Sequence, residues 1–391
     1  MDPYELRDGT VLLSPAVPAD ADAVTAACQD PQVQEWTTVP SPYVRGDAED
    51  FLGRLVPAGW ESGTGTTWAV RDGAGRPLAG MIGLSGIANG SAEVGFWTAP
   101  EARGRGLTTA ALRLATGHAL DPQGLDLQRV VWTAFVGNWA SRRVAWRAGY
   151  RVEGTVRLGC LQRGRRRDQW VGTVVRGDSL SPATPWLTPV PLAGGRVTLR
   201  RFTDGDADAV VEACTDRVSR YWLGGLPDPY TREVALEYVR SREEDAAAGR
   251  AVHWAAEPPG GGPALGAFSL MGLDQRPGGA EVGYWVHPAA RGTGVATAGV
   301  RLLVEHALSP AEQGGLGLRR LVVAHGEGND ASGRVIERTG FRPIGVERAA
   351  ERLGDGSIVD LRWYDLLLEE ARLRPPGAPS RPAAAPGLPG R

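Results

Sequence analysis

The hydrophobic and polar positions follow the same succession of patterns twice along the chain. In the first copy, short β-branched and apolar runs predict strands at residues 11–13, 66–70, 78–84, 92–98 and 129–135. Helical periodicity is predicted over 19–55, from Leu107 onward and over 139–148, and two more strands end the copy. This mixture predicts an α+β fold, with a mixed sheet flanked by helices.

The second copy repeats the first in order and spacing. PADADAVTAAC, which ends at Cys28, matches DGDADAVVEAC, which ends at Cys214, and EVGFWTAPEARGRG from Glu93 matches EVGYWVHPAARGTG from Glu281. A repeat of this length indicates a duplicated domain. The predicted organisation is domain 1–178, a Pro- and Gly-rich linker 179–195, domain 196–373 and a disordered tail 374–391.

Composition excludes several functions. The formal net charge of the 391 residues is -2, so the chain lacks the cationic field that nucleic-acid binding needs. No Lys occurs, which excludes a Walker-type phosphate loop and a Schiff-base lysine. The three cysteines have no C-x-x-C spacing and the five histidines no H-E-x-x-H spacing, so no metal site is predicted. Without a signal peptide or a long apolar stretch, a cytoplasmic location with no membrane contact is predicted.

A glycine-rich loop enters a predicted helix in each copy. Glycines let the backbone turn tightly, and the free N–H groups of a helix start attract anions. A dinucleotide-binding loop would need a third glycine, where Thr109 and Thr297 stand. The loops are Arg103-Gly104-Arg105-Gly106-Leu107-Thr108 and Arg291-Gly292-Thr293-Gly294-Val295-Ala296.

With a following β-branched strand, N-x-x-S and a Gly-aromatic pair, both copies resemble the GNAT superfamily of N-acetyltransferases. The family's pyrophosphate motif is Q/R-x-x-G-x-G/A, and E-x-G-[FY]-W before the loop resembles its ribosomal-protein and N-terminal acetyltransferase branch. Thr108 departs from the motif at the small final position, which Ala296 fills. The resemblance covers nearly all of both copies and implies two tandem GNAT-type domains, each with a mixed, splayed sheet.

The resemblance implies an acyl-CoA cofactor, acetyl-CoA in the first instance. Strand ends would contact the pantetheine arm, the loops would bind the diphosphate, and each Asn would contact pantetheine. Arg143 and Arg334 would reach a CoA phosphate or remain solvated helix charges. The other residues implied in cofactor binding are Trp97, Thr98, Ala99, Arg103, Gly104, Arg105, Gly106, Leu107, Thr108 and Asn138 in the first copy, and Trp285, Val286, His287, Arg291, Gly292, Thr293, Gly294, Val295, Ala296 and Asn329 in the second.

Acyl transfer to an amine needs a base and a donor to the departing sulfur. Glu93 and Glu281 precede the cofactor-facing strand and are candidate bases; alternatively they cap a strand or pair with Arg. Ser141 and Ser332 resemble the family hydroxyl that protonates or steadies the thiolate. Asp168 and Asp360 match an acidic position that organises the site. The candidate substrate-binding residues are Glu35, Trp36, Trp222 and His253.

The predicted function is acyl-CoA-dependent N-acylation of a small-molecule or peptide primary amine, such as a natural-product or antibiotic amine. An acyl carrier protein could replace CoA as donor, because both carry pantetheine. The alternative is that one domain is silent and acts as an acyl-CoA sensor or scaffold. If only one domain is active, the unbroken motif favours the second. We expect a monomer whose two domains form an intramolecular pseudo-dimer.

Overall fold

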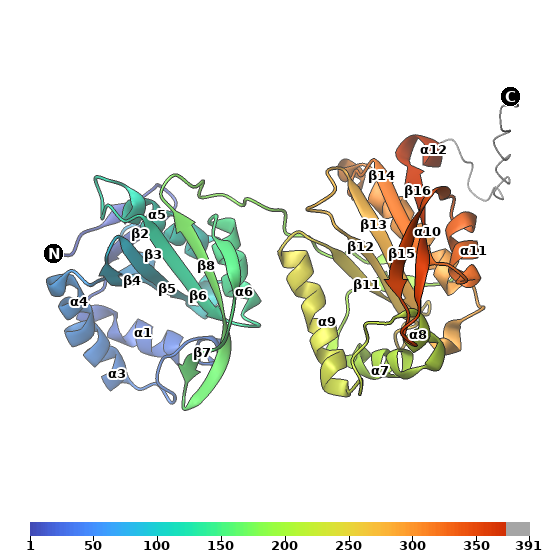
Figure 1. Cartoon of the computed structure of the whole chain (residues 1–391). Coiled ribbons are helices and arrows are strands. Elements are labelled where there is room, and N and C mark those ends of the chain that lie inside the picture. Colours follow the sequence, from blue (N-terminus) through green and yellow to red (C-terminus); the bar gives the residue numbers. More distant parts are fainter. Residues whose placement is uncertain (373–391) are drawn as a thin grey trace, which may run out of the picture. The chain divides into compact units, whose positions relative to one another are not determined.

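The computed structural model describes residues 1–372, which form two compact units, Met1–Ala183 and the chain from Thr184 onward. We call them domain 1 and domain 2 (Figure 1). The division falls inside the segment predicted as a linker. The predicted tail, 374–391, lies outside the described residues, and the predicted domain limits stay predictions.

Domain 1 consists of a sheet, two groups of helices and short connecting turns. Its strands are β1 (Leu6–Arg7), β2 (Leu12–Pro15), β3 (Gly65–Arg71), β4 (Leu78–Ala88), β5 (Ser91–Thr98), β6 (Arg129–Phe135), β7 (Arg151–Gln162) and β8 (Arg165–Val175). Its helices are α1 (Ala21–Cys28), α2 (Pro31–Trp36), α3 (Arg45–Asp50), α4 (Val56–Ser62), α5 (Leu107–Leu120) and α6 (Trp139–Arg147). Short turns are η1 (Pro18–Asp20), the π-helical η2 (Phe51–Leu55) and η3 (Pro100–Ala102).

Domain 2 repeats this order. Its strands are β9 (Leu192–Ala193), β10 (Thr198–Arg200), β11 (Val252–Glu257), β12 (Gly266–Met271), β13 (Gly279–Val286), β14 (Arg320–Gly326), β15 (Arg342–Arg352) and β16 (Ile358–Leu367). Its helices are α7 (Ala207–Thr215), α8 (Arg217–Trp222), α9 (Arg232–Ala247), α10 (Val295–Leu308), α11 (Asp330–Arg338) and α12 (Leu368–Arg372). The turns η4 (Asp204–Asp206), η5 (Pro288–Ala290) and η6 (Ala311–Gln313) complete it.

Each sheet is antiparallel except for one central pair of strands. The strand orders are β1-β2-β3-β4-β5-β6-β8-β7 and β15-β16-β14-β13-β12-β11-β10-β9. β5 pairs in parallel with β6 only over Ser91–Val94 and Arg129–Trp132, and β13 pairs with β14 only over Gly279–Glu281 and Arg320–Val322. Beyond these residues the two strands separate, which confirms the predicted mixed, splayed sheet with flanking helices.

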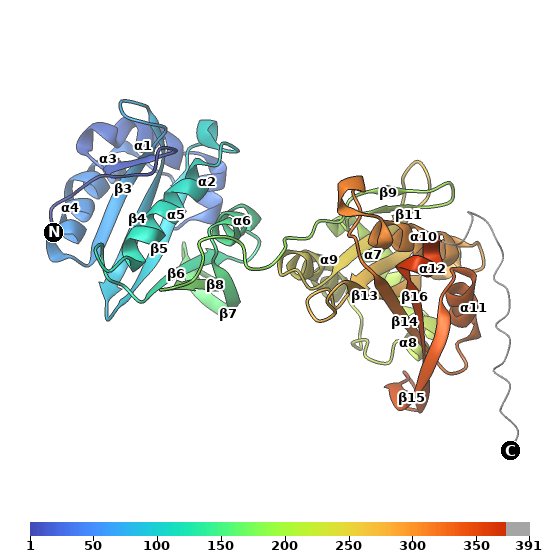
Figure 2. The same cartoon turned by 90° about the horizontal axis from the view of Figure 1, so that it is seen from above.

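Helices cover both faces of each sheet. In domain 1, α1, α3 and α4 lie on one face and α5 on the other; in domain 2, α9 lies opposite α10 and α11 (Figures 1 and 2). α5 buries Ala111, Leu112 and Ala115 against the fully buried Trp132 and Leu84 of the sheet. Trp254 and Phe268 occupy the corresponding core of domain 2. We call the face under α1 to α4, and under α7 to α9, the acceptor face.

Part of the predicted linker is structured. Leu192–Ala193 forms β9, which pairs with β10, and Val190 O accepts a 2.8 Å hydrogen bond from Trp254 Nε1. Trp68 Nε1 makes the equivalent bond to Tyr4 O in domain 1, at 2.9 Å. The residues ahead of each first strand are therefore tied to a buried indole, a contact that composition alone did not indicate. None of the helices within residues 1–372 has the length and apolar character needed to cross a membrane.

Candidate active site

A chamber opens in domain 1 where β5 and β6 separate. Its volume is about 650 Å³, and its wall includes both predicted catalytic residues, Glu93 and Ser141. Gly83 and Gly95 form part of its floor, and a Cβ on Gly95 would meet nothing within 4 Å. Of the predicted cofactor and substrate residues, Trp36, Trp97, Thr98, Arg103 and Asn138 also line it.

The glycine loops have the geometry that an anion cradle requires. Gly104 and Gly106 have φ of 75° and 78°, and Gly292 and Gly294 have 75° and 86°, all in the left-handed region that favours glycine. A Cβ on Gly104, Gly106 or Gly292 would meet nothing within 4 Å. Leu107 and Val295 then begin α5 and α10, whose first N–H groups have no acceptor within the helix.

The departure at Thr108 is matched by a second difference between the domains. Thr98 Oγ1, at the end of β5, lies 2.5 Å from Thr108 Oγ1. The same two positions are Val286 and Ala296 in domain 2. The two hydroxyl groups satisfy each other, so Thr108 is accommodated while both loops keep nearly equal glycine φ angles.

The loop arginines make ion pairs with the protein. Arg103 pairs with Asp30, which accepts hydrogen bonds from the first turn of α2, and Arg291 pairs with Asp216 at 2.6 Å at the start of α8. The Arg103 guanidinium lowers the pKa of Asp30. Arg105 pairs with Asp72. These contacts fix the loop against its neighbours, a role that sequence spacing did not reveal.

The N-x-x-S segments form helix caps. Asn138 Oδ1 accepts a 3.1 Å hydrogen bond from Ser141 N, and Asn329 Oδ1 accepts one of 3.2 Å from Ser332 N. Both asparagines are thus N-caps, of α6 and α11. Arg143 and Arg334 are exposed on these helices, and Ala99 and His287 follow the ends of β5 and β13.

The serine hydroxyls have different partners in the two domains. Trp132 Nε1 donates to Ser141 Oγ at 3.0 Å, which leaves the serine proton available to another acceptor. Ser332 Oγ instead lies 2.8 Å from the hydroxyl of Tyr284, whose pKa is raised to about 12 by burial. Phe96 occupies the position of Tyr284 in domain 1.

The two candidate bases also differ. Glu93 Oε1 accepts a 2.6 Å hydrogen bond from Thr133 Oγ1 and faces the chamber. Glu281 forms an ion pair of 3.3 Å with Arg276 instead, and Ala324 stands where domain 1 has Thr133. The alternative interpretation, in which a Glu pairs with Arg, therefore describes Glu281.

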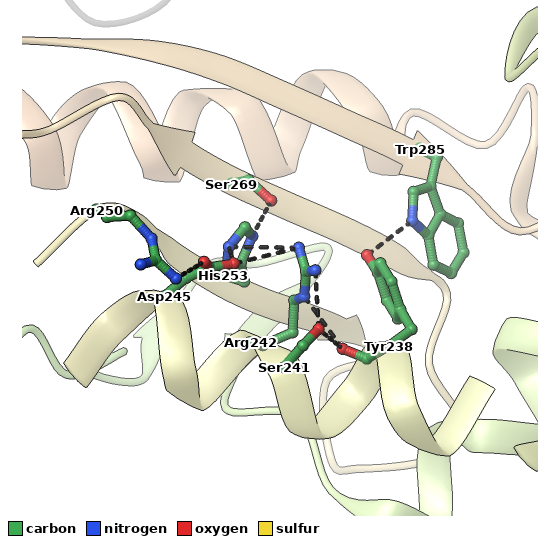
Figure 3. Close-up of polar contacts among 8 residues, drawn as sticks. All are labelled: Tyr238, Ser241, Arg242, Asp245, Arg250, His253, Ser269 and Trp285. Carbon is green, nitrogen blue, oxygen red and sulfur yellow. Dashed lines mark hydrogen bonds and ion pairs between the residues drawn. The ribbon is translucent and has the colours of Figure 1, made fainter. Parts of the chain in front are cut away.

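The predicted substrate residues lie at different depths. Trp36 lines the chamber under the Arg167 guanidinium, whose carbon is 5.1 Å from the ring centroid. Glu35 is exposed and pairs with Arg167 at 3.2 Å, so it lies outside the lining residues. Trp222 contacts the Gly326 and Gly328 region of domain 2. His253 is 4% exposed and bound within a polar network (Figure 3).

Asp168 and Asp360 organise a strand irregularity. Asp168 Oδ1 accepts a 2.8 Å hydrogen bond from Leu158 N, and Asp360 Oδ1 accepts one of 2.8 Å from Ala349 N. Leu158 and Ala349 have φ of 50° and 52°, a conformation that is uncommon outside glycine. Each aspartate holds the bulge of a long hairpin beside the splayed strands.

Several chamber residues were not identified from the sequence. Phe51, Thr133, Cys160 and Gln169 line it beside the predicted residues. Period-two alternation in 129–135 could have placed Thr133 on the face of Glu93, but only the strand register shows that the two meet. Among residues 1–372, no group of His, Cys, Asp and Glu is arranged to hold a metal ion.

The sequence matches a known domain family in both halves. The model of the family "Acetyltransferase (GNAT) domain" matches residues 10–151 and 196–342. The chain belongs to the GNAT acetyltransferase family. The predicted tandem duplication, the N-acetyltransferase class and coenzyme A as the family cofactor are thereby confirmed.

Two relatives from Bacillus subtilis (strain 168) are similar over part of the chain. The "Putative ribosomal N-acetyltransferase YdaF" is 41% identical over 93 residues, which are 23% of this chain and 50% of YdaF. The "Uncharacterized N-acetyltransferase YoaA" is 30% identical over 155 residues, 39% of this chain and 83% of YoaA. The chain thus spans about half the length of YdaF.

Solved structures of acetyltransferases are similar as well. A putative ribosomal-protein-serine acetyltransferase from Vibrio cholerae is 18% identical, with 45% of this chain and 99% of that chain covered and a TM-score of 0.40. Mycobacterium smegmatis RimJ, in complex with CoA-disulfide, is 20% identical, with 44% and 86% covered and a TM-score of 0.39.

Proposed function

We propose that this chain transfers an acyl group, acetyl in the first instance, directly from an acyl-CoA thioester to a primary amine. The supporting observation is that Glu93 and Ser141 line one chamber at the point where β5 and β6 separate. A base on β5 and a proton donor on α6 are thereby available at the same opening.

The residues present fit the cofactor. Gly104, Gly106 and Gly292 leave open space where a Cβ would stand, at helix starts that favour an anion. These loops would hold the diphosphate, and the ends of β5 and β13 would bind the pantetheine arm. When bound, acyl-CoA supplies a thioester carbonyl activated for attack by an amine.

The two candidate catalytic residues of domain 1, Glu93 and Ser141, have different roles. Glu93, oriented by Thr133, takes the proton of the incoming ammonium group. Beyond Val94, where β5 is no longer paired with β6, N–H groups on the β6 side of β5 would stabilise the negative charge on the carbonyl oxygen. Ser141 accepts from Trp132 and gives its own proton to the departing sulfur.

The acceptor is a primary amine of a peptide or small molecule. The name of YdaF makes the N-terminal peptides of ribosomal proteins the first acceptors to test. Natural-product amines, and an acyl carrier protein in place of CoA, are the further arms of that test. The cytoplasmic location and the monomeric pseudo-dimer stay predictions.

The test follows release of free thiol from acetyl-CoA and longer acyl-CoAs with a panel of these amines, alongside calorimetric titration with CoA. We expect heat of binding and thiol release with at least one amine. Absence of both would contradict the proposal.

The second candidate, one silent domain that binds acyl-CoA, is favoured by one observation. Glu281 is paired with Arg276, whereas Glu93 faces its chamber. The guanidinium of Arg276 thus engages the Glu281 carboxylate, whereas the Glu93 carboxylate is held by a neutral hydroxyl at the opening.

A further inference from the structure

The strand registers place three residues of each domain in one row across the acceptor face. In domain 1, Thr67 pairs with Gly83 and Gly83 with Gly95. In domain 2, His253 pairs with Ser269 and Ser269 with Gly283. All three residues of the first row line the chamber or form its floor, whereas the second row carries two larger polar side chains.

A further difference lies one step along the strands. Ser85 pairs with Glu93 in domain 1, and Met271 pairs with Glu281 in domain 2. Met271 Cε would lie 2.7 Å from a Cβ on Gly283, so this methyl group covers the glycine. The matching glycine, Gly95, has open space above it. Met271 therefore occupies in domain 2 the space that is empty in domain 1.

His253 is held by hydrogen bonds on both ring nitrogens (Figure 3). Nδ1 lies 2.7 Å from Ser269 Oγ, and Nε2 lies 3.1 Å from Asp245 Oδ2 on α9. His253 and Ser269 are 4% and 8% exposed. Because both ring nitrogens are hydrogen-bonded, the imidazole has a fixed orientation on this face of the domain 2 sheet.

Charges from α9 and the following turn complete this network. Asp245 also pairs with Arg250 at 3.0 Å, and Arg242 Nη1 lies 3.4 Å from His253 Nε2 (Figure 3). The Arg242 guanidinium lies 4.4 Å from the centroid of the Tyr238 ring, and Tyr238 OH accepts from Trp285 Nε1 at 3.3 Å. A closed set of satisfied polar contacts resists displacement, because opening it exposes unpaired buried groups.

We propose that amine acceptors are acylated in the chamber of domain 1 alone, and that His253, Ser269 and Met271 close the same face of domain 2. This inference rests on the proposed function and names the domain and the residues that decide it. Domain 2 keeps its glycine loop and so binds acyl-CoA, but admits no amine across this face. It reverses the expectation drawn from the loop motif, which favoured the second copy.

Ser269, His253 and Asp245 are also the residue types of a hydrolytic triad. In that use the serine must reach a substrate, but Ser269 is 8% exposed and pairs with Gly283, which Met271 covers. The network therefore serves closure, and hydrolysis of acyl-CoA by domain 2 becomes an outcome of the test.

The experiment blocks the chamber or the glycine loop of domain 1 by substitution and measures the remaining amine-dependent rate. One variant carries the residues of domain 2 in domain 1: Thr67→His, Gly83→Ser and Ser85→Met. A second, Gly95→Leu, fills the floor by a single change where a Cβ meets no neighbour. A third, Gly106→Asp, places a carboxylate in the diphosphate loop. Thiol release with the amine that the native chain uses, thiol release without amine and the CoA stoichiometry are measured for each.

We expect all three variants to lose about 100-fold or more of the amine-dependent rate. The two chamber variants should still bind two CoA per chain, and Gly106→Asp should bind one. Retention of more than about a tenth of the rate in Gly95→Leu or Gly106→Asp would show that domain 2 acylates amines and would overturn the proposal. The same retention in the triple variant would overturn the assignment of closure to these three side chains. Thiol release by Gly106→Asp in the absence of amine would overturn the assignment of closure as well, because it would show that domain 2 hydrolyses acyl-CoA.

These outcomes are separable from failure of the proposed function. If the native chain binds no CoA and releases no thiol with any amine, the proposed function fails before the variants are compared. If a chamber variant unfolds domain 1, the titration shows one CoA per chain, and the residual rate still reports domain 2 alone.

Discussion

Thr133 Oγ1 donates a 2.6 Å hydrogen bond to Glu93 Oε1, across the two strands that part to form the chamber. One carboxylate oxygen is thereby fixed and the carboxylate faces the opening. This hydrogen bond has no counterpart in domain 2, because Ala324 has no hydroxyl. Glu281 forms an ion pair with Arg276 instead. The two halves thus share a loop but differ in the group that could remove a proton.

Glu93→Gln should lower kcat by about 100-fold or more, because the amide cannot accept the ammonium proton. Affinity for CoA should change little, since the diphosphate loop is untouched. Steady-state thiol release and calorimetry measure the two quantities. Equal losses in Glu93→Gln and the matched Glu281→Gln would contradict the assignment of chemistry to domain 1.

Ser141→Ala should lower kcat by about tenfold to 100-fold, because the departing sulfur loses its proton donor. Ser141→Thr keeps the hydroxyl and should recover most of that rate. Single-turnover measurements separate this effect from product release. If alanine and threonine variants were equally slow, Ser141 would be a helix-cap residue without a part in the chemistry.

The Thr98 and Thr108 hydroxyls form a pair that can be tested by a double-mutant cycle. Thr98→Val alone should destabilise domain 1 by about 1 kcal/mol, because Thr108 loses its partner. The double variant Thr98→Val, Thr108→Ala reproduces the pair of domain 2 and should recover most of this loss. Urea unfolding measures the coupling, and purely additive effects would show that the hydroxyls do not interact.

His253 should make domain 2 less stable as the pH falls below about 6.5. Burial lowers the pKa of His253; the hydrogen bond to Asp245 raises it in part, and the charge of Arg242 lowers it further. The unfolded chain therefore binds the proton first as pH falls, and stability present above pH 6.5 is lost through the lower folded pKa. Melting temperatures at pH 7 and pH 5 measure the loss, which should be smaller in His253→Gln. His306, whose pKa is also lowered by burial, accounts for a part that remains.

Asp168→Ala should loosen the β7–β8 hairpin, because Leu158 N loses its acceptor at a residue with φ of 50°. The expected cost is about 1–2 kcal/mol, and Asp168→Asn, which keeps an acceptor oxygen, should cost less. Amide hydrogen exchange around Leu158 reports the change locally. Unaltered exchange in the alanine variant would mean that the strand holds the bulge without the carboxylate.

Local patterns predicted the elements that carry the cofactor loop. The strand at 129–135 and the helix start at Leu107 are confirmed, because their alternation, glycines and apolar spacing act within one short segment. The helical region predicted over 19–55 is divided into the end of the short turn η1, three α-helices and a π-helical turn, and Pro31 begins the second α-helix. A single periodic pattern did not show those divisions, because they depend on what each piece packs against.

Only part of the candidate site was predicted, because the remaining contacts depend on the packing of distant segments. Glu93, Ser141 and Trp36 line the chamber as predicted, whereas Glu35 lies outside it. Arg103 also lines the chamber, but it forms an ion pair with Asp30 that was not predicted. Asp30 and Arg103 are 73 residues apart, so no spacing rule links them. His253 was predicted as a substrate-binding residue, but its partners on α9 and β12 were not identified from the sequence.

The sequence by itself determined that this protein is a duplicated GNAT acetyltransferase, because the repeat, the glycine loops and the strand periodicity are local patterns of residues. Only the tertiary structure decided which side chains share a face and which space stays empty. Gly95 and Gly283 stand in the same motif, yet one lies open and the other lies under Met271. That difference arises from contacts between neighbouring strands, whose register is fixed by folding of the whole domain.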